Sequence, residues 1–172
     1  MIVGRHEYKS VSADPLTANH MVFVGWDLQG KGYYAGVVDD AIENFEKSIV
    51  ESIMPTTEIA QIENAILPYL GPEATRSACR TIERDRWESE LSSIRFAVVE
   101  YDDRQQTTGT IATGDGSYRY LATQITGRGT ARLVDLTQIP PGVKPGDVVT
   151  LQTRDGVLEV SKPRDAAHEV ER

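Results

Sequence analysis

The sequence predicts an α+β fold: an N-terminal β-hairpin, about three helices and a return strand, followed by a small SH3-like or OB-like β-barrel. Strand-like segments over residues 20–39, helical periodicity over 42–91 and short segments between Gly and Pro turns over 108–162 predict it. We expect four parts: an arm (1–19), an α+β domain with acidic helices (20–103), a barrel domain (104–162) and a mobile tail (163–172).

The first expected element is a β-hairpin. HMVFVGWD (20–27) and GYYAGVVD (32–39) are rich in β-branched and aromatic residues. Between them, Gly30 and Gly32 can adopt positive φ at the turn. Trp26, beside this turn, has two interpretations: a core residue of the hairpin, or an anchor for a protein partner.

Three helices are expected next. The first begins after Asp39 and Asp40 and ends at Met54-Pro55; the second runs from Thr56 or Thr57 to Leu70-Gly71-Pro72. The third spans about 73–91, and IRFAVVEYD (94–102) returns to strand composition. Helical spacing in the first helix is shown by Ile42, Phe45, Ile49, Val50 and Ile53.

The barrel is predicted by five short β-like segments. They are TGTIAT, SYRYLATQIT, TARLVDL, DVVTLQT and GVLEVSK, separated by turns that contain Gly or Pro. An exposed edge strand of such a barrel offers a surface on which a second copy can pair, so a homodimer is one of the assemblies that we consider.

Length and composition indicate a globular protein without a membrane segment. The chain has 172 residues, of which 40% are hydrophobic and 26% charged. No apolar run approaches the roughly 18 residues of a membrane span, and MIVGRHEYKS lacks the apolar centre of a signal peptide. Cys79 is the single cysteine, which excludes an internal disulfide. We expect a cytoplasmic location.

Charge is unevenly distributed along the chain. Residues 39–93 contain twelve acidic and five basic residues, a balance of −7, whereas residues 104–162 contain seven basic and five acidic residues, a balance of +2. The acidic part either solvates the outer faces of the helices or attracts a basic protein surface. The acidic residues expected to contact such a partner are Glu83, Asp85, Glu88 and Glu90.

The sequence gives little support for an enzyme. Cys79 has no histidine near it in the sequence, and His6 and His168 lie in segments expected to be loose, which position a catalytic base poorly. An enzyme would require a pocket that brings together residues such as His20, Asp27 and Asp102. We expect no catalytic residue, no metal site and no cofactor.

The QITGRGTARLVDL segment (124–136) has two interpretations. Cations and aromatic rings on a barrel are the components of an oligonucleotide-binding face, and the candidate contact residues are Tyr118, Arg119, Arg128 and Arg132. Alternatively, the tyrosines are half-buried and Arg128 is at the tip of a hairpin turn. A balance of +2 is small for a nucleic-acid-binding domain.

Two segments resemble known families. TGTIAT to GVLEV (108–160) is similar to the KfrB-type domain of plasmid proteins and of proteins beside conjugative relaxases. VGWDLQGKGYYAGVVD (24–39) looks like the start of short uncharacterised proteins of proteobacterial plasmids and integrative elements, with Leu28-Gln29 where those have Arg-Pro. The resemblances imply a mobile-element setting, and neither family has an assigned catalytic residue to carry over. The first is carried by Gly109, Ile111, Gln124, Gly127, Arg128, Gly129, Asp135, Gly146, Val148, Asp155 and Gly156, and the second by Gly25, Trp26, Asp27, Tyr33, Tyr34, Val38 and Asp39.

These observations predict a non-enzymatic accessory protein of a mobile genetic element that binds another protein. Its most concrete form is an anti-CRISPR or anti-restriction inhibitor whose acidic helical surface occupies the basic surface of a host defence complex. The alternative is a plasmid conjugation or maintenance module whose barrel binds DNA or a relaxase.

Overall fold

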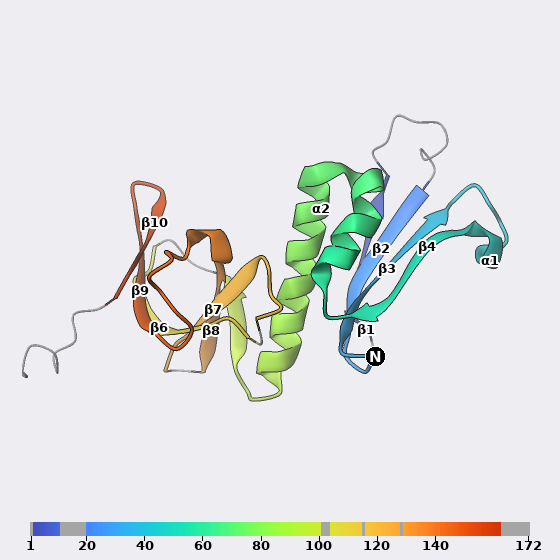
Figure 1. The fold of residues 1–172 in the computed structure, drawn as a ribbon. Coiled ribbons are helices and arrows are strands. Elements are labelled where there is room, and N and C mark those ends of the chain that lie inside the picture. Colours follow the sequence, from blue (N-terminus) through green and yellow to red (C-terminus); the bar gives the residue numbers. More distant parts are fainter. Residues whose placement is uncertain (1, 11–19, 101–103, 115, 128, 163–172) are drawn as a thin grey trace, which may run out of the picture. The chain divides into compact units, whose positions relative to one another are not determined.

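The computed structural model divides the chain into two compact units, residues 1–90 and residues 91–172 (Figure 1). It describes residues 2–10, 20–100, 104–114, 116–127 and 129–162, without the side chains of residues 2–4 and 54. The domain boundary expected after residue 103 differs from the boundary between these two units, which falls after residue 90. The expected tail, 163–172, lies outside the described residues.

Unit 1 is built on an antiparallel sheet in the strand order β1-β2-β3-β4. Its strands are β1 (Ile2–Lys9), β2 (His20–Asp27), β3 (Gly32–Asp39) and β4 (Ile49–Thr56). The predicted hairpin is confirmed, because β2 pairs with β3 from His20–Asp39 to Asp27–Gly32. Residues 2–9, expected to belong to an arm, form β1 instead; residues 11–19 of the expected arm lie outside the described residues.

The turn between β2 and β3 uses a different residue from the predicted ones. Lys31, with φ 48°, has the positive φ, and neither Gly30 nor Gly32 does. Gly32 is required for another reason: a Cβ there would lie 2.6 Å from the backbone nitrogen of Thr56 on β4. The absence of a side chain allows the two backbones to approach each other.

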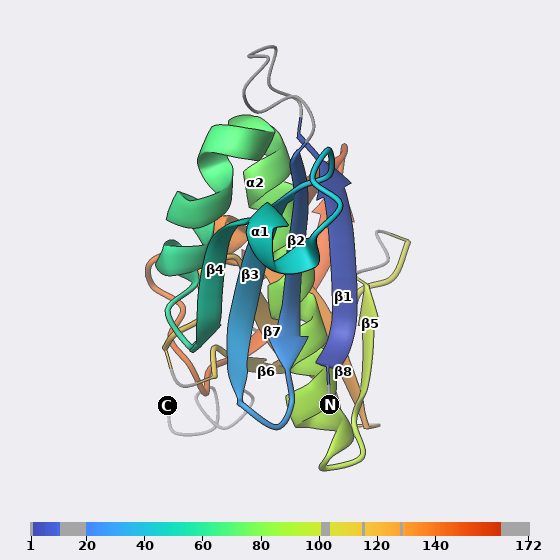
Figure 2. The same cartoon turned by 90° about the vertical axis from the view of Figure 1, so that its right-hand side faces the viewer.

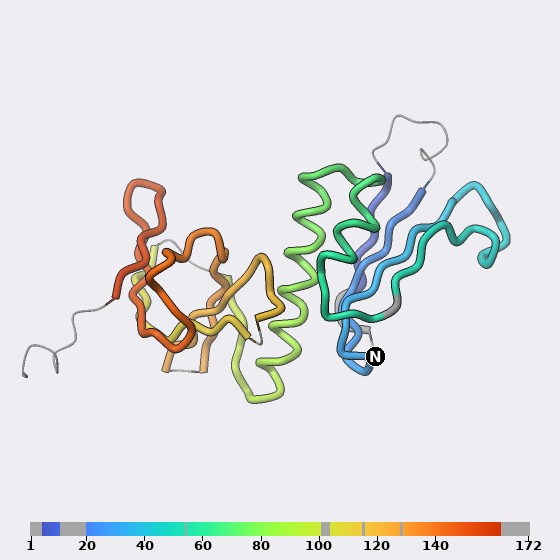
Figure 3. Tube along the Cα trace, in the orientation of Figure 1, coloured from blue at the N-terminus to red at the C-terminus, as the bar shows by residue number. Residues whose placement is uncertain are grey.

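The predicted helix over residues 42–53 is wrong. Only α1 (Phe45–Ser48) is helical, and β4 starts at Ile49. Ile49, Val50 and Ile53 are β-branched and favour a strand, and β4 extends the sheet by pairing with β3. The apolar repeat at helical spacing therefore gives a hairpin with a one-turn helix at its tip, as the chain trace shows (Figure 3).

The predicted second and third helices together make up α2 (Ile59–Ser92), which is interrupted by a break between them. Gly71 inside α2 has φ 78° and ψ 172°, which is not helical, and it lies where Leu70-Gly71-Pro72 predicted the end of the second helix. The buried residues of α2 include Ile62, Ile66 and Ile82.

The helix α2 packs against one face of the unit 1 sheet, the inner face (Figure 2). Along β2 and β3, alternate residues project to this face. A hydrogen bond joins β1 to α2, since Nε2 of His6 lies 2.7 Å from Oδ2 of Asp85. The buried apolar residues of the inner face on β2 and β3 are Val22, Val24, Trp26, Tyr33, Ala35 and Val37.

Unit 2 contains a six-stranded sheet in the order β10-β9-β6-β7-β8-β5, with edges at β10 and β5. It is not a closed barrel. Its elements are β5 (Ala97–Glu100), β6 (Thr107–Ala112), β7 (Leu121–Ile125), β8 (Thr130–Asp135), η1 (Leu136–Gln138), β9 (Val148–Arg154) and β10 (Val157–Ser161). The return strand expected at 94–102 belongs here, because β5 pairs in parallel with β8.

A buried glutamine joins three strands of unit 2. Gln124, on β7, has no exposed surface; its Nε2 donates to the carbonyl oxygens of Thr107 on β6, at 3.0 Å, and Val149 on β9, at 2.9 Å. Its Oε1 accepts from Oγ1 of Thr107 at 2.6 Å. The side chain thereby provides hydrogen-bond partners for three polar groups on the two neighbouring strands. Beside it, the apolar core contains Ile111, Val134, Val149 and Leu151.

Candidate functional site

Two glycines shape the outer face of the unit 1 sheet, the face opposite α2. A Cβ at Gly25 on β2 would lie 2.6 Å from the hydroxyl oxygen of Tyr34, so the Tyr34 ring lies directly against the glycine. At Gly36 on β3 the nearest atom to such a Cβ is the carbonyl oxygen of Glu51, at 3.9 Å. The first glycine is therefore covered by a ring, and the second leaves open space on the sheet.

This open space is part of a cavity of about 340 Å³, which we call the outer groove. The guanidinium of Arg5 lies 4.5 Å from the ring centre of Phe23 at the groove and 3.7 Å from the carboxylate of Glu7. Burial raises the pKa of Tyr34 above its ordinary value of 10.0, so its phenol stays neutral to higher pH than that of an exposed tyrosine. The side chains and backbone that line the groove belong to Arg5, Phe23, Asp27, Tyr34, Ala35, Gly36, Val38, Phe45, Ile49, Glu51, Ser52, Ile53 and Pro55.

Exposed apolar side chains gather at the end of the β3–β4 hairpin. Phe45 is 70% exposed, the largest exposure among the large hydrophobic residues of the described chain. Ile42, Ile49 and Val50 are each more than 40% exposed. Four such residues within one short segment are a concentration that a solvated loop does not need, and it is typical of a protein-binding surface.

Short-range hydrogen bonds fix the shape of this hairpin tip. Oδ1 of Asp39 accepts from the amide of Ala41 at 3.0 Å, which closes a turn directly after β3. Asn44 caps α1, since its Oδ1 accepts from the amide of Lys47 at 3.2 Å. Oγ of Ser48 donates to the carbonyl oxygen of Phe45 at 2.6 Å. The exposed Phe45 is thus presented on an ordered turn.

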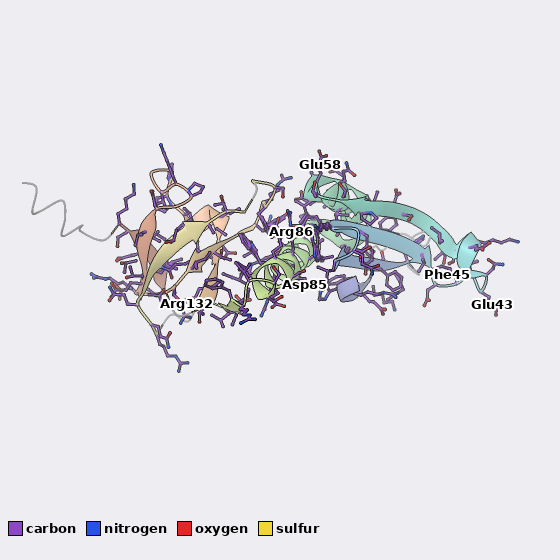
Figure 4. All side chains as sticks on the ribbon, turned by 90° about the horizontal axis from the view of Figure 1, so that it is seen from below. Glu43, Phe45, Glu58, Asp85, Arg86 and Arg132 are labelled. Atoms are coloured by element: carbon purple, nitrogen blue, oxygen red, sulfur yellow. The ribbon has the colours of Figure 1, made fainter. Side chains whose placement is uncertain are left out.

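Acidic residues are interspersed in the sequence among the apolar residues of the tip. Residues 39–51 contain five acids and one base, Lys47. Glu43 and Phe45 project from the tip, at the opposite end of unit 1 from Asp85 and Arg86 (Figure 4). We define the hairpin surface as the apolar residues Ile42, Phe45, Ile49 and Val50 together with Asp39, Asp40, Glu43, Glu46 and Glu51.

The four acidic residues predicted on the helices all lie on α2, and they differ in exposure. Glu83 has no exposed surface, so it is not part of a surface patch. The Asp85 side chain is 13% exposed and pairs with His6, and burial raises its pKa more than this hydrogen bond lowers it. Glu88 and Glu90 are 43% and 42% exposed and pair with Arg84 and Arg86. Of the four, only the last two offer substantial acidic surface.

Trp26 is a core residue and not an exposed anchor. It is 3% exposed on the inner face, with its ring 5.1 Å from that of Tyr33 in an edge-to-face arrangement. The guanidinium of Arg86 lies 5.1 Å from the Trp26 ring, and its Nη1 donates to the Tyr33 hydroxyl at 3.3 Å. Burial raises the pKa of Tyr33, which keeps this acceptor neutral.

The candidate nucleic-acid contacts of unit 2 are not on one strand. Tyr118 and Arg119 precede β7, which starts at Leu121; Tyr118 is buried and Arg119 is exposed. Nη2 of Arg132, on β8, donates to Oε1 of Gln105 at 2.6 Å. Arg128 lies outside the described residues. Of these four candidate contacts, only Arg132 lies on a strand among the described residues.

Arg132 lines a polar groove of about 670 Å³ in unit 2. Its buried Nε has no hydrogen-bond partner among the described residues. Arg132 is also the only basic residue in the described lining of this groove. The remaining lining residues are polar or glycine: Gln105, Gln106, Thr107, Thr108, Thr126, Gly127 and Thr130.

The residues considered for catalysis are not brought together by the described part of unit 1. His20 and Asp27 are at opposite ends of β2, which puts them about 23 Å apart. Asp102 lies outside the described residues, and Cys79 is buried. Across the described chain, no group of three or more His, Cys, Asp or Glu residues is arranged to hold a metal ion.

None of the helices in the described ranges is long and apolar enough to cross a membrane.

Comparisons with known proteins return no relative for this architecture. A scan against protein-family models finds no match, and searches of curated proteins and of solved structures find no similar protein or structure.

Proposed function

We propose that this protein is a non-enzymatic binding protein and that its partner contact is the hairpin surface of unit 1. The observation that carries the proposal is the clustering of Ile42, Phe45, Ile49 and Val50, all exposed, on a hairpin tip with an excess of acidic residues. Apolar residues contribute affinity through burial, and surrounding acids favour a basic partner and speed encounter.

The most concrete form of this proposal is an inhibitor of a host defence complex, such as CRISPR or restriction machinery, encoded on a mobile element. Complexes that bind nucleic acid have Arg- and Lys-lined channels, which an acidic surface with apolar anchors complements. The mobile-element setting is the expectation that the resemblance stated for residues 24–39 and 108–160 implies. The contact surface proposed here differs from the acidic stretch of α2, since Glu83 is buried and Asp85 is engaged by His6.

The test is capture of the partner by tagged full-length protein from host lysate, with half of the sample treated with nuclease. Capture of the partner by the wild type should persist after nuclease treatment. The Phe45→Ser variant should not capture this partner. Leu67→Ser is the matched control, because Leu67 is 43% exposed on α2 of the same unit. Equal capture by the Phe45→Ser variant would contradict the proposed surface.

A second candidate function is DNA or relaxase binding by unit 2. The observation that favours it is the polar groove at Arg132, whose buried Nε has no partner among the described residues. It predicts that the full chain retards DNA with a salt-dependent affinity that Arg132→Glu abolishes. Arg154→Glu is the control: Arg154 is exposed on β9 and outside the described lining of the groove. An absence of retardation at low salt would exclude DNA binding.

A further inference from the structure

We infer that β4 is a strand-addition site, on which an extended segment of a partner protein with alternating apolar and basic residues pairs as a fifth strand. The inference rests on the proposed function, since it specifies how a protein partner engages the hairpin. Three properties of β4 support it: its place at the sheet edge, the grooves on both of its sides, and its charge.

The first property is that β4 is at the edge of the sheet. It pairs with β3 only, so one side of its backbone is unpaired within the four-stranded sheet. Pro55 lacks an amide hydrogen and restricts pairing at the end of the strand, which leaves the segment Ile49–Met54. This length matches a short extended peptide.

The second property is that β4 separates two grooves. The outer groove lies on one side, and a second cavity of about 490 Å³, the edge groove, is lined jointly by β4 and by the first half of α2. Glu51 and Ile53 line both grooves. Side chains of an added strand alternate between the two faces of the sheet, so successive residues of the partner would enter different grooves.

The linings of the grooves specify the partner's side chains. Phe23, Phe45 and Ile49 line the outer groove, which suits branched aliphatic residues. Gln61, Asn64 and Glu51 supply oxygen acceptors to the edge groove, which suits Lys or Arg. An alternating aliphatic–basic segment satisfies both linings at once.

The third property, charge, selects a partner over a second copy. Residues 39–58 contain six acids and one lysine. Pairing of β4 with the β4 of a second copy brings two such segments together, and like charges across a strand pair are destabilising. A basic segment gains from the same charges.

The test measures binding of a fluorescein-labelled heptapeptide of alternating Val and Lys to the full-length protein by anisotropy. Two further versions of the peptide are N-methylated on alternate amides, in one register or the other. Methylation removes the donors that face β4 in one register only, so we expect one version to bind about tenfold more weakly and the other to bind like the parent. Glu51→Lys should weaken binding several-fold, and Glu73→Lys, an exposed acid on α2, should not.

The outcomes separate this inference from the proposed function. Equal binding by both methylated peptides, or no binding of the parent peptide at millimolar concentration, overturns strand addition, and the loss of partner capture by Phe45→Ser is then unaffected. Register-dependent binding together with undiminished capture by Phe45→Ser supports β4 as the site and contradicts the hairpin surface. Self-association of the protein that is abolished by Glu51→Pro would assign the β4 edge to a second copy and overturn a basic partner segment.

Discussion

The ring of Tyr34 lies against the backbone of Gly25, where an added Cβ would be only 2.6 Å from the tyrosine hydroxyl oxygen. Tyr34 and Gly25 are directly opposite each other on β3 and β2. The ring fills the space that a side chain at residue 25 would use, and the nearby Gly36 keeps its space open as part of the outer groove.

The two glycines should therefore respond differently to alanine. Gly25→Ala forces the Tyr34 ring away and should lower the free energy of unfolding by about 1–3 kcal/mol. Gly36→Ala meets no atom closer than 3.9 Å and should be neutral or stabilising, by up to about 1 kcal/mol. Urea unfolding of both variants measures the difference; equal effects would contradict the described packing.

Arg86 should be important for the stability of unit 1. Its side chain is 4% exposed and contacts Tyr33, Trp26 and Glu90. Arg86→Ala leaves the Tyr33 hydroxyl without this donor and opens a cavity, so we expect a loss of about 3 kcal/mol by chemical denaturation. Arg84→Ala is the control: the pair of Arg84 with Glu88 is more exposed, and its loss should cost less than about 1 kcal/mol.

Stability should depend on pH through Asp85. Burial raises the pKa of this carboxyl above its ordinary value of 3.8, so the folded state retains a proton that the unfolded state has released. The contribution of Asp85 to the free energy of unfolding is therefore complete below the pKa that this carboxyl has in the unfolded state. It is lost as the pH rises through the raised pKa of the folded state. Relative to Asp85→Asn, the wild type should lose stability over that window in urea unfolding at a series of pH values.

A gain of wild-type stability relative to Asp85→Asn over the same window would mean that the hydrogen bond to His6 outweighs burial. Glu73→Gln, an exposed substitution on the same helix, controls for the removal of one acidic group.

Gln124 should be difficult to replace in unit 2. Gln124→Leu retains an apolar stem but removes the partners of two backbone carbonyls and of the Thr107 hydroxyl. We expect a loss of about 2–3 kcal/mol in thermal or chemical unfolding. Gln152→Leu, on β9 of the same unit, should change stability by about 0.5 kcal/mol or less. A small effect at Gln124 would mean that water replaces its hydrogen bonds.

The sequence predicts best where local patterns and final packing agree. The β2–β3 hairpin follows from two segments rich in β-branched and aromatic residues, and the break at Gly71 follows from a Gly-Pro pair inside a helical repeat. The five strand segments of the C-terminal part are also present, but their sheet remains open, since closure depends on strand pairing that local composition does not specify.

The sequence pattern does not predict the hairpin surface, and the reason is physical. Ile42, Phe45 and Ile49 recur at helical spacing, and an apolar repeat is ordinarily the buried face of a helix. Pairing of β4 with β3 overrides that tendency, and the same apolar residues become exposed on a hairpin. Strand composition from Ile49 to Ile53, and Asn44 as a helix cap, are the signals that favour this outcome.

Some residues on which the expected resemblance of residues 108–160 depends have structural explanations in this fold. Gln124 joins three strands, and Gly129, Gly146 and Gly156 have positive φ at turns. A Cβ at Gly109 would overlap the carbonyl oxygen of Ile125. These positions therefore indicate how the unit folds and do not identify what it binds.

The most direct test of the hairpin surface is site-specific photo-crosslinking in host cells, with p-benzoylphenylalanine in place of Phe45. We predict a covalent product with one protein at this position, and none when the same group replaces Leu67 on α2 or Val157 on β10. Crosslinking from residue 67 or 157 with none from residue 45 would contradict the hairpin surface as the site of partner binding.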